Sequence, residues 1–408
     1  MTVETSESAR VLALERLGVL DTDPEERFDR VTRLTQRLFG VPMASVTMVD
    51  TDRQWRKSFV GLDGPVAQRE GAFCDVTIRA SRTLVVEDAA ADPQFADNPF
   101  VQGDPHLRFY AGHPLEAPGG ERVGTLCVLD VVPHEFTDAD RGVLRDLALW
   151  VQGELQRDAE LDRAGEVQRG LLPRLPPDLD GYRVAARCLP ARGVGGDFYD
   201  WSAVPGGTAF VLADVMGKGM AAAIVAASAR AALRTGVRDP DLPRGVAEAD
   251  EALTADLEGT STFVTAWCGV LDPPTGALTS VDAGHGIVTL LHADGRRERL
   301  AGDGLPLGVL PEMTRGVRTA TLGRGDRLVV ASDGLVDLLA SLGLPGGDPT
   351  ALTPDERPPG PHGAELQQLA RDVVQAPDAQ ATLDAFLAVA AGRYLPDDLT
   401  VLVVERAA

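Results

Sequence analysis

Cysteine is scarce in this sequence, and the few cysteines are widely separated. The 408 residues include only Cys74, Cys127, Cys188 and Cys268, with no CxxC pair and no Cys/His cluster. This spacing argues against a structural zinc site. It is typical of buried free thiols in a reducing cytoplasm, and redox sensing by Cys74 and Cys127 is the alternative.

Positive charge and long apolar runs are also scarce. Lys and Arg number 39 against 61 Asp and Glu, which gives a formal net charge of −22. Such a surface repels nucleic acid and anionic membranes, so neither is an expected partner. No apolar run approaches the roughly 18 residues of a membrane helix, and the polar start MTVETSESAR is unlike a signal peptide. We therefore expect a cytoplasmic protein.

The length is enough for two domains, and the first has mixed patterning. Apolar residues at helical spacing cover 8–40, and alternating stretches such as ASVTMVDTDRQWRKSFVG and RVGTLCVLD then predict strands. A helix opened by Thr137 closes the region, with Asp138 and Asp140 in its first turn. This order predicts an α+β domain over residues 10–155.

Four stretches of this first region carry a family resemblance. EGAFCDVTI, VEDAAADPQFADNPFV, LRFYAGHPL and GTLCVLD stand in the order found in many bacterial GAF sensor domains. The region resembles a GAF domain, which implies an antiparallel sheet with flanking helices. The resemblance also implies a small-molecule or other signal, whose identity the motifs do not define.

Residues 138–172 are predicted to form a linking helix, in one piece or two. Leu144, Ala148, Val151 and Leu155 make a short apolar seam suited to pairing with a second copy of the chain. We expect a homodimer on this basis. The alternative is that the helix packs only on the sheet of its own domain.

The remainder, residues 173–408, alternates short strands with grouped helices. Helices are predicted over 221–235, 244–258, 363–375 and 379–394, and the strands between them include TAFVLADV and DRLVVASDG. Helices grouped in pairs around many strands favour a layered αββα sandwich. The Pro/Gly-rich segment 342–363 is predicted to be an exposed loop or mobile flap.

Acidic residues recur in this second domain where a strand meets a tight turn. They occur in VGGDFYD, ADVMGKGMAAA, ASDGLVD and LPDDLTVLVV, and Lys218 is the only cation in these loops. Carboxylates delivered by apolar strands are costly unless something pairs with them. Oxygen-rich sites of this kind suit Mg²⁺ or Mn²⁺. A diguanylate-cyclase loop, suggested by Gly-Gly-Asp, is rejected because the other acids have no place in it.

The same motifs, in the same order, carry a second resemblance. With VQRGLLPRLPP, STFVTAWCGVLD and DAGHG, they resemble the metal-dependent (PPM, type 2C) protein serine/threonine phosphatases of the SpoIIE and RsbU branch. The resemblance implies an αββα sandwich with two Mn²⁺ or Mg²⁺ ions. It also implies hydrolysis of phosphoserine or phosphothreonine, commonly on an anti-sigma-factor antagonist of the STAS type.

The resemblance assigns roles to individual residues. Catalytic acids are implied at Asp197, Asp214, Asp333 and Asp397, and metal ligands at these four with Val215, through its carbonyl, and Asp398. Adjacent residues on a strand point to opposite faces, so Asp397 and Asp398 are not expected to serve equally as ligands. Asp398 is the less certain of the two. Lys218 and Arg192 are candidates for binding substrate phosphate.

Two functions therefore remain for the chain as a whole. The first is a signal-regulated phosphatase, in which the GAF domain controls hydrolysis of a phosphorylated partner protein. The second is a catalytically silent scaffold that binds an anti-sigma factor or phosphoprotein. The intact set of acids favours the phosphatase.

Overall fold

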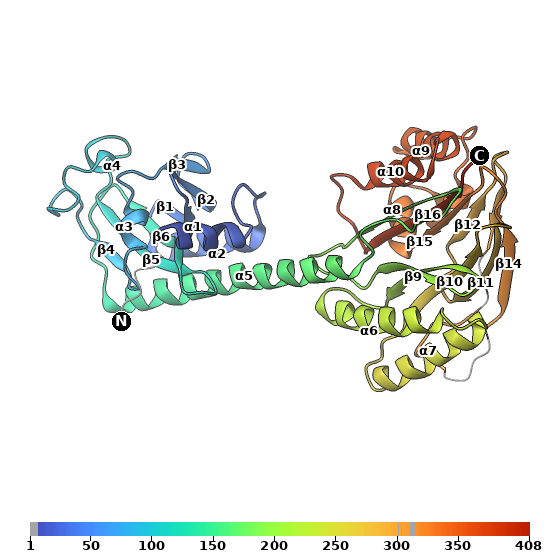
Figure 1. Ribbon diagram of the computed structural model, residues 1–408. Helices are drawn as coiled ribbons and strands as arrows, with labels where there is room; N and C mark the ends of the chain where they lie inside the picture. The colour runs from blue at the N-terminus through green and yellow to red at the C-terminus, as the bar shows by residue number, and fades with distance from the viewer. Residues whose placement is uncertain (1–6, 301, 303, 311–314) are drawn as a thin grey trace. The chain divides into compact units, whose positions relative to one another are not determined.

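The computed structural model describes residues 7–300, 302, 304–310 and 315–408 (Figure 1). The chain divides into two compact units, with the boundary between Glu160 and Leu161. Each unit combines antiparallel sheets with flanking helices, which confirms the predicted α+β, two-domain class. Within the described ranges, no helix has both the length and the apolar composition to cross a membrane.

The first unit is built on one six-stranded antiparallel sheet in the order β3-β2-β1-β6-β5-β4. The strands are β1 Met43–Val49, β2 Arg53–Val60, β3 Val66–Gln68, β4 Leu84–Val86, β5 Phe109–Glu116 and β6 Arg122–Asp130. The helices are α1 Glu7–Arg16, α2 Glu26–Phe39, α3 Phe73–Thr77, α4 Pro99–Gln102 and α5 Asp138–Leu171.

Both faces of this sheet are covered by apolar packing. One face packs against α1, α2 and the first half of α5, and the other against α3 and α4. Because both faces are covered, β1 is buried along its whole length and lacks the polar-apolar alternation of a half-exposed strand.

The apolar seam of α5 lies inside this core. Leu144, Ala148, Val151 and Leu155 are at most 3% exposed and pack with residues of β1, β5 and β6. The prediction that these four residues contact a second chain is therefore wrong, because they are buried in the core of their own unit. Helical spacing reveals an apolar face but does not say which surface covers it, and here the domain's own sheet does so.

The second unit contains two five-stranded antiparallel sheets, in the orders β14-β11-β10-β9-β8 and β13-β12-β15-β16-β7. The strands are β7 Tyr182–Leu189, β8 Phe198–Val204, β9 Gly207–Val215, β10 Val264–Asp272, β11 Ala277–Ala283, β12 Val288–Leu291, β13 Arg297–Arg299, β14 Val317–Thr321, β15 Arg327–Ala331 and β16 Leu399–Arg406. The helices are α6 Met220–Gly236, α7 Leu242–Leu257, α8 Asp333–Ser341, α9 Gly363–Gln375 and α10 Ala379–Ala390.

The two sheets of this unit pack face to face in an αββα sandwich. Phe210, Leu212 and Trp267 of one sheet pack with Val330 and Leu402 of the other in the central layer. Helices α6 and α7 cover the outer face of the first sheet, and α8, α9 and α10 cover that of the second. Figure 1 shows α6 and α7 on one side of the strands and α9 and α10 on the other.

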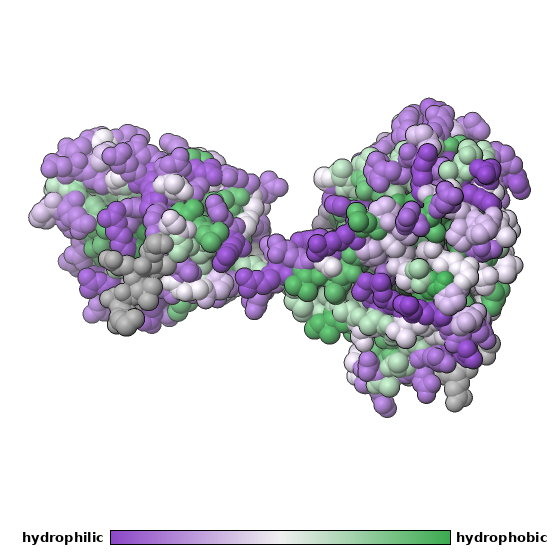
Figure 2. All heavy atoms as spheres, in the orientation of Figure 1, coloured by the Kyte–Doolittle hydropathy of each residue, from purple (hydrophilic) through white to green (hydrophobic). Residues whose placement is uncertain are grey.

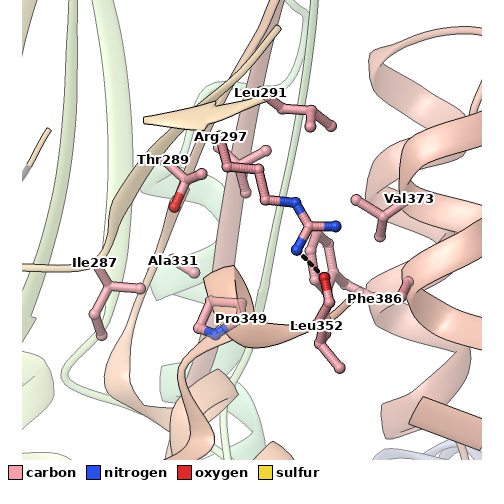
Figure 3. A pocket seen from close by; sticks show the side chains of 11 residues that line it. Ile287, Thr289, Leu291, Arg297, Ala331, Pro349, Leu352, Val373 and Phe386 are labelled. Atoms are coloured by element: carbon pink, nitrogen blue, oxygen red, sulfur yellow. Dashed lines mark hydrogen bonds between the residues drawn. The ribbon is translucent and has the colours of Figure 1, made fainter. Parts of the chain in front are cut away.

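The segment 342–363 is only partly the exposed loop that its composition predicts. Its first half forms two 3-10 turns, Pro345–Gly347 and Pro349–Ala351, and buries Leu344 and Leu352 in the layer under α9 and α10. Arg297 donates a hydrogen bond to the carbonyl of Leu352 at the edge of a small apolar cavity (Figure 3). Leucines spaced between the prolines and glycines explain this packing.

The location of the α5 seam gives a test of the first unit. Leu144→Ala should destabilise it by about 2–5 kcal/mol, because the side chain is fully buried. Leu149→Ala on the same helix removes a side chain that is 50% exposed and should change stability by about 0.5 kcal/mol or less. Hydrogen exchange of β5 and β6 peptides in increasing urea measures both. Equal effects would contradict the assignment of the seam to the core.

Candidate functional site

Asp197 and Asp214 lie opposite each other at one end of the first sheet of the sandwich. Asp197 directly precedes β8, and Asp214 is the second-last residue of β9. The two strands are antiparallel, with Phe198 opposite Ala213. One further step in this register places the two carboxylates face to face.

A second pair of acids comes from the corresponding end of the other sheet. Asp333 follows β15 and opens α8, whereas Asp397 precedes β16. These strands are antiparallel, and Ser332 donates its backbone N–H to the Thr400 carbonyl at 2.9 Å where they end. Four carboxylates from two antiparallel strand pairs therefore gather at one edge of the sandwich.

Asp197 is the most deeply buried of these acids. Its side chain is 1% exposed, and neither carboxylate oxygen has a hydrogen-bond partner of normal geometry. Burial, reinforced by the nearby charge of Asp214, raises the pKa of Asp197 well above its ordinary value. A buried carboxylate without a partner is expensive, so the geometry favours a cation beside it.

The other acids are close enough to disfavour one another's charge. Burial raises the pKa of Asp214 to about 7, and the carboxylates of Asp333 and Asp397 contribute. Burial and Asp397 also raise the pKa of Asp333. In the described ranges, no group of three or more His, Cys, Asp or Glu side chains is arranged closely enough to hold a metal ion as it stands. The hard oxygen donors that converge here nevertheless suit Mg²⁺ or Mn²⁺.

Asp398 is engaged differently from its neighbour. Its two oxygens accept hydrogen bonds from the backbone N–H groups of Ala191, at 2.7 Å, and Gly196, at 2.6 Å. A Cβ at Gly195 would lie 2.2 Å from the same carboxylate. Asp398 therefore fastens the loop that leads to Asp197.

The candidate phosphate-binding cations occupy different surroundings. Lys218 pairs with Asp397 at 2.8 Å and also donates to the Pro396 carbonyl. Its ammonium thus lies at the edge of the acid cluster. Arg192 is exposed on the loop before Asp197, and within the described part of the chain it makes no hydrogen bond or ion pair with the acids.

The carbonyl of Val215 approaches the same loop. A Cβ at Gly196 would lie 2.6 Å from this oxygen, so only glycine allows the loop and the end of β9 to come this close. Val215 is fully buried and directly follows Asp214 in the chain.

Gln168 was not singled out from the sequence, although it belongs to the quoted motif VQRGLLP. Its amide donates to the Gly195 carbonyl at 2.6 Å and accepts from the Gly195 N–H at 3.1 Å. The end of α5 approaches closely, since a Cβ at Gly165 would lie 2.2 Å from the Gly193 carbonyl. The helix therefore holds the loop that leads to Asp197. The sequence did not indicate this role, because Gln168 is one polar residue among several in a predicted helix.

Asp200 lies near the acids in sequence but faces away from them. Its carboxylate is 2% exposed and pairs with Arg234 at 2.7 Å and Arg230 at 3.1 Å, both on α6. Side chains alternate along a strand, so Asp200 shares the α6 face with Phe198. Its role is to attach β8 to α6.

Comparison with known families gives two matches. The model for stage II sporulation protein E (SpoIIE) matches residues 205–407, and the model for the GAF domain matches residues 23–155. Both family resemblances predicted from the sequence motifs are confirmed.

Two curated relatives cover parts of the chain. A cyclic di-GMP phosphodiesterase of Pseudomonas aeruginosa is 35% identical over 150 residues, which cover 36% of this chain and 26% of that protein. Protein IcfG of Synechocystis sp. is 29% identical over 206 residues, covering 44% of this chain and 32% of the relative. The chain thus spans about a quarter to a third of the length of these relatives.

Solved structures include a similar mycobacterial protein. The RsbU and RsbW domains of a Mycobacterium tuberculosis protein align with 25% identity and a TM-score of 0.45, over 57% of this chain and 63% of that one.

The unpartnered carboxylate predicts an unusual stability effect. Asp197→Asn should make the protein about 1–2 kcal/mol more stable in EDTA, because it removes a buried charge. In millimolar Mn²⁺ the order should reverse, since only the parent chain would gain binding free energy. Thermal unfolding in both buffers measures this.

Asp200→Asn is the matched control, three residues along the chain. It breaks a buried ion pair and should cost about 3 kcal/mol in both buffers. A loss of stability for Asp197→Asn in EDTA would mean that the carboxylate has a structural partner.

Proposed function

The chain joins a GAF domain to a metal-dependent serine/threonine phosphatase domain of the SpoIIE family, and from this premise we propose that it removes phosphate from phosphoserine or phosphothreonine of another protein. One observation carries the proposal: the buried, unpartnered carboxylate of Asp197 faces Asp214, whose pKa is raised by burial and also by Asp333 and Asp397 of the other sheet. Such a cluster suits divalent cations better than it suits any organic ligand.

In this proposal the acids hold two Mn²⁺ or Mg²⁺ ions. Asp197, Asp214, Asp333 and Asp397 would hold the ions through their carboxylates, and the Val215 carbonyl would be a further ligand. The ions would supply the charge neutralisation and water activation that hydrolysis of a phosphate ester needs.

The remaining residues of the site position these acids. The Lys218 ammonium forms an ion pair with Asp397 at 2.8 Å. It also places positive charge at the edge of the acid cluster, where a substrate phosphate would bind. Asp398, with both oxygens on backbone N–H groups, acts as a support for the Asp197 loop rather than as a ligand. Arg192 is the more distant candidate for phosphate contact.

A protein substrate fits the surface beside the acids. Met216, Met220 and Ile224 are between 41% and 65% exposed, directly after Asp214 in sequence, and Figure 2 has apolar residues at the surface over part of α6. A groove of about 250 Å³ next to Asp333 is lined by Val336 and Arg299. Apolar side chains around a charged centre are typical of protein-docking surfaces.

We propose that the substrate is an anti-sigma-factor antagonist of the STAS type, acting in a partner-switching pathway. The motifs shared with the SpoIIE and RsbU branch support this choice. The GAF domain would receive the signal, and a cavity of about 240 Å³ between its sheet and α3 offers room for a small ligand.

A homodimer and a cytoplasmic location complete the proposal. Because the α5 seam is buried, a dimer would use the opposite face of that helix, where Val143, Leu149 and Trp150 are between 42% and 50% exposed. Free cysteines at all four positions support a reducing compartment.

The reaction gives the first functional test. Full-length protein should release phosphate from a phosphoserine peptide with Mn²⁺ or Mg²⁺ and none in EDTA. Asp333→Asn should lower the rate at least about 100-fold, because a ligand carboxylate is lost. Asp372→Asn, exposed on α9 and not among the charges that act on the acids of the site, is the control and should keep the parent rate. A scaffold would show no turnover with either metal while still binding its partner.

Gln168 gives a second test, directed at the loop. Gln168→Ala removes both hydrogen bonds to Gly195 and should reduce kcat about 10- to 100-fold, since small displacements of catalytic groups have effects of this size. It should also raise the Mn²⁺ concentration needed for half-maximal activity, which a general loss of stability would not. Glu166→Ala, exposed on the same helix, serves as the control. An unchanged metal requirement would exclude a positioning role for Gln168.

A further inference from the structure

Cys74 and Cys127 come together in the GAF domain although 53 residues separate them. Cys74 lies on the short helix α3 and Cys127 on the central strand β6. Their sulfur atoms are 3.9 Å apart. We refer to these two residues as the thiol pair.

The thiol pair lines the GAF cavity of about 240 Å³. The two side chains are 5% and 2% exposed, so bulky reagents are excluded. A water molecule occupies about 30 Å³ in the liquid, so a cavity of this size admits a reactant as small as hydrogen peroxide.

The surroundings of Cys74 favour its thiolate. The Thr125 hydroxyl donates to the Cys74 sulfur at 3.2 Å and the Tyr110 hydroxyl at 3.7 Å. A hydrogen bond from Cys127, these two hydroxyls and the charge of Arg56 lower the pKa of Cys74 to about 7, against the opposing effect of burial. Cys127 keeps its proton, because the adjacent Cys74 and burial raise its pKa well above the ordinary value.

The other two cysteines lack these features. Burial raises the pKa of Cys268 to about 12 and that of Cys188 above the ordinary thiol range. Among the described residues, neither has a second thiol in contact with its sulfur. Since the thiolate is the reactive form of cysteine, only Cys74 combines reactivity with a nearby second thiol.

We propose that the thiol pair is a redox site, at which peroxide converts Cys74 and Cys127 into a reversible intramolecular disulfide. The Cys74 thiolate attacks one peroxide oxygen and the O–O bond breaks. The second oxygen leaves as hydroxide, which takes up the proton that Cys74 released on ionisation and becomes water. The resulting Cys74 sulfenic acid is attacked by the Cys127 sulfur. The S–S bond forms, the S–O bond breaks, and the Cys127 proton leaves in a second molecule of water.

The disulfide requires a modest movement. An S–S bond measures about 2.05 Å, so the sulfur atoms must approach by about 2 Å. Cys74 sits on a helix of only 5 residues, bounded by loops, which allows this movement more readily than β6 does. A dithiol reductant reverses the reaction, transferring two electrons and two protons to the cysteines.

Mass spectrometry of the full-length protein tests the proposal. Reduced protein treated with one equivalent of hydrogen peroxide, then alkylated and digested, should yield linked peptides containing Cys74 and Cys127, which dithiothreitol releases. The rate should rise about tenfold between pH 6 and 8, as the thiolate fraction of Cys74 increases. Absence of the linked peptides while Cys188 or Cys268 is oxidised would overturn the proposal.

Two variants define the order of attack. Cys127→Ser should stop the reaction at a sulfenic acid on Cys74, which dimedone captures, and Cys74→Ser should leave Cys127 unmodified. Cys268→Ala is the control and should form the disulfide at the parent rate. Circular dichroism of each variant checks folding. Dimedone capture on Cys127 in the Cys74→Ser variant, with native folding, would overturn the assignment of Cys74 as nucleophile. Peptide mapping needs no phosphatase activity, so its outcome is independent of the proposed hydrolysis.

Discussion

The burial of Asp197 without a hydrogen-bond partner is the constraint on which the second unit depends. A carboxylate in this position is unfavourable by itself, and the facing acids make it more so. The sandwich holds it there through packing elsewhere, in the layer between the sheets and in the two layers under the helices. The free energy of that packing thus offsets the cost of burying the Asp197 carboxylate. A bound cation would lower this cost.

The loop before Asp197 shows how local contacts serve this constraint. Asp398 holds it from the neighbouring sheet and Gln168 from the end of α5, in both cases through backbone atoms. Gly195 and Gly196 are required because a side chain at either position would collide with Asp398 or Val215. A change in the packing of residues 161–171 of α5 would therefore reach the loop before β8, because Gln168 is hydrogen-bonded to Gly195.

The sequence predicted the parts of this structure that local patterns govern. Helices α6, α7, α9 and α10 were expected within a few residues of their observed ends, and Asp197, Asp214, Asp333 and Asp397 were expected at strand ends. Long-range contacts could not be predicted in this way. Asp398 accepts hydrogen bonds from N–H groups 202 and 207 positions away. Helical periodicity likewise could not show that the domain's own sheet covers the α5 seam. The buried leucines of 342–363 were hidden by the surrounding prolines and glycines.

The place of β16 in its sheet has a consequence for biosynthesis. This strand, the last of the unit in chain order, lies between β15 and β7, and β7 is the first strand of the unit. Until residues beyond 397 have left the ribosome, β7 has no partner in the sheet and Asp197 lacks the loop support given by Asp398. Assembly of the acid cluster therefore waits until the residues of β16 have been synthesised.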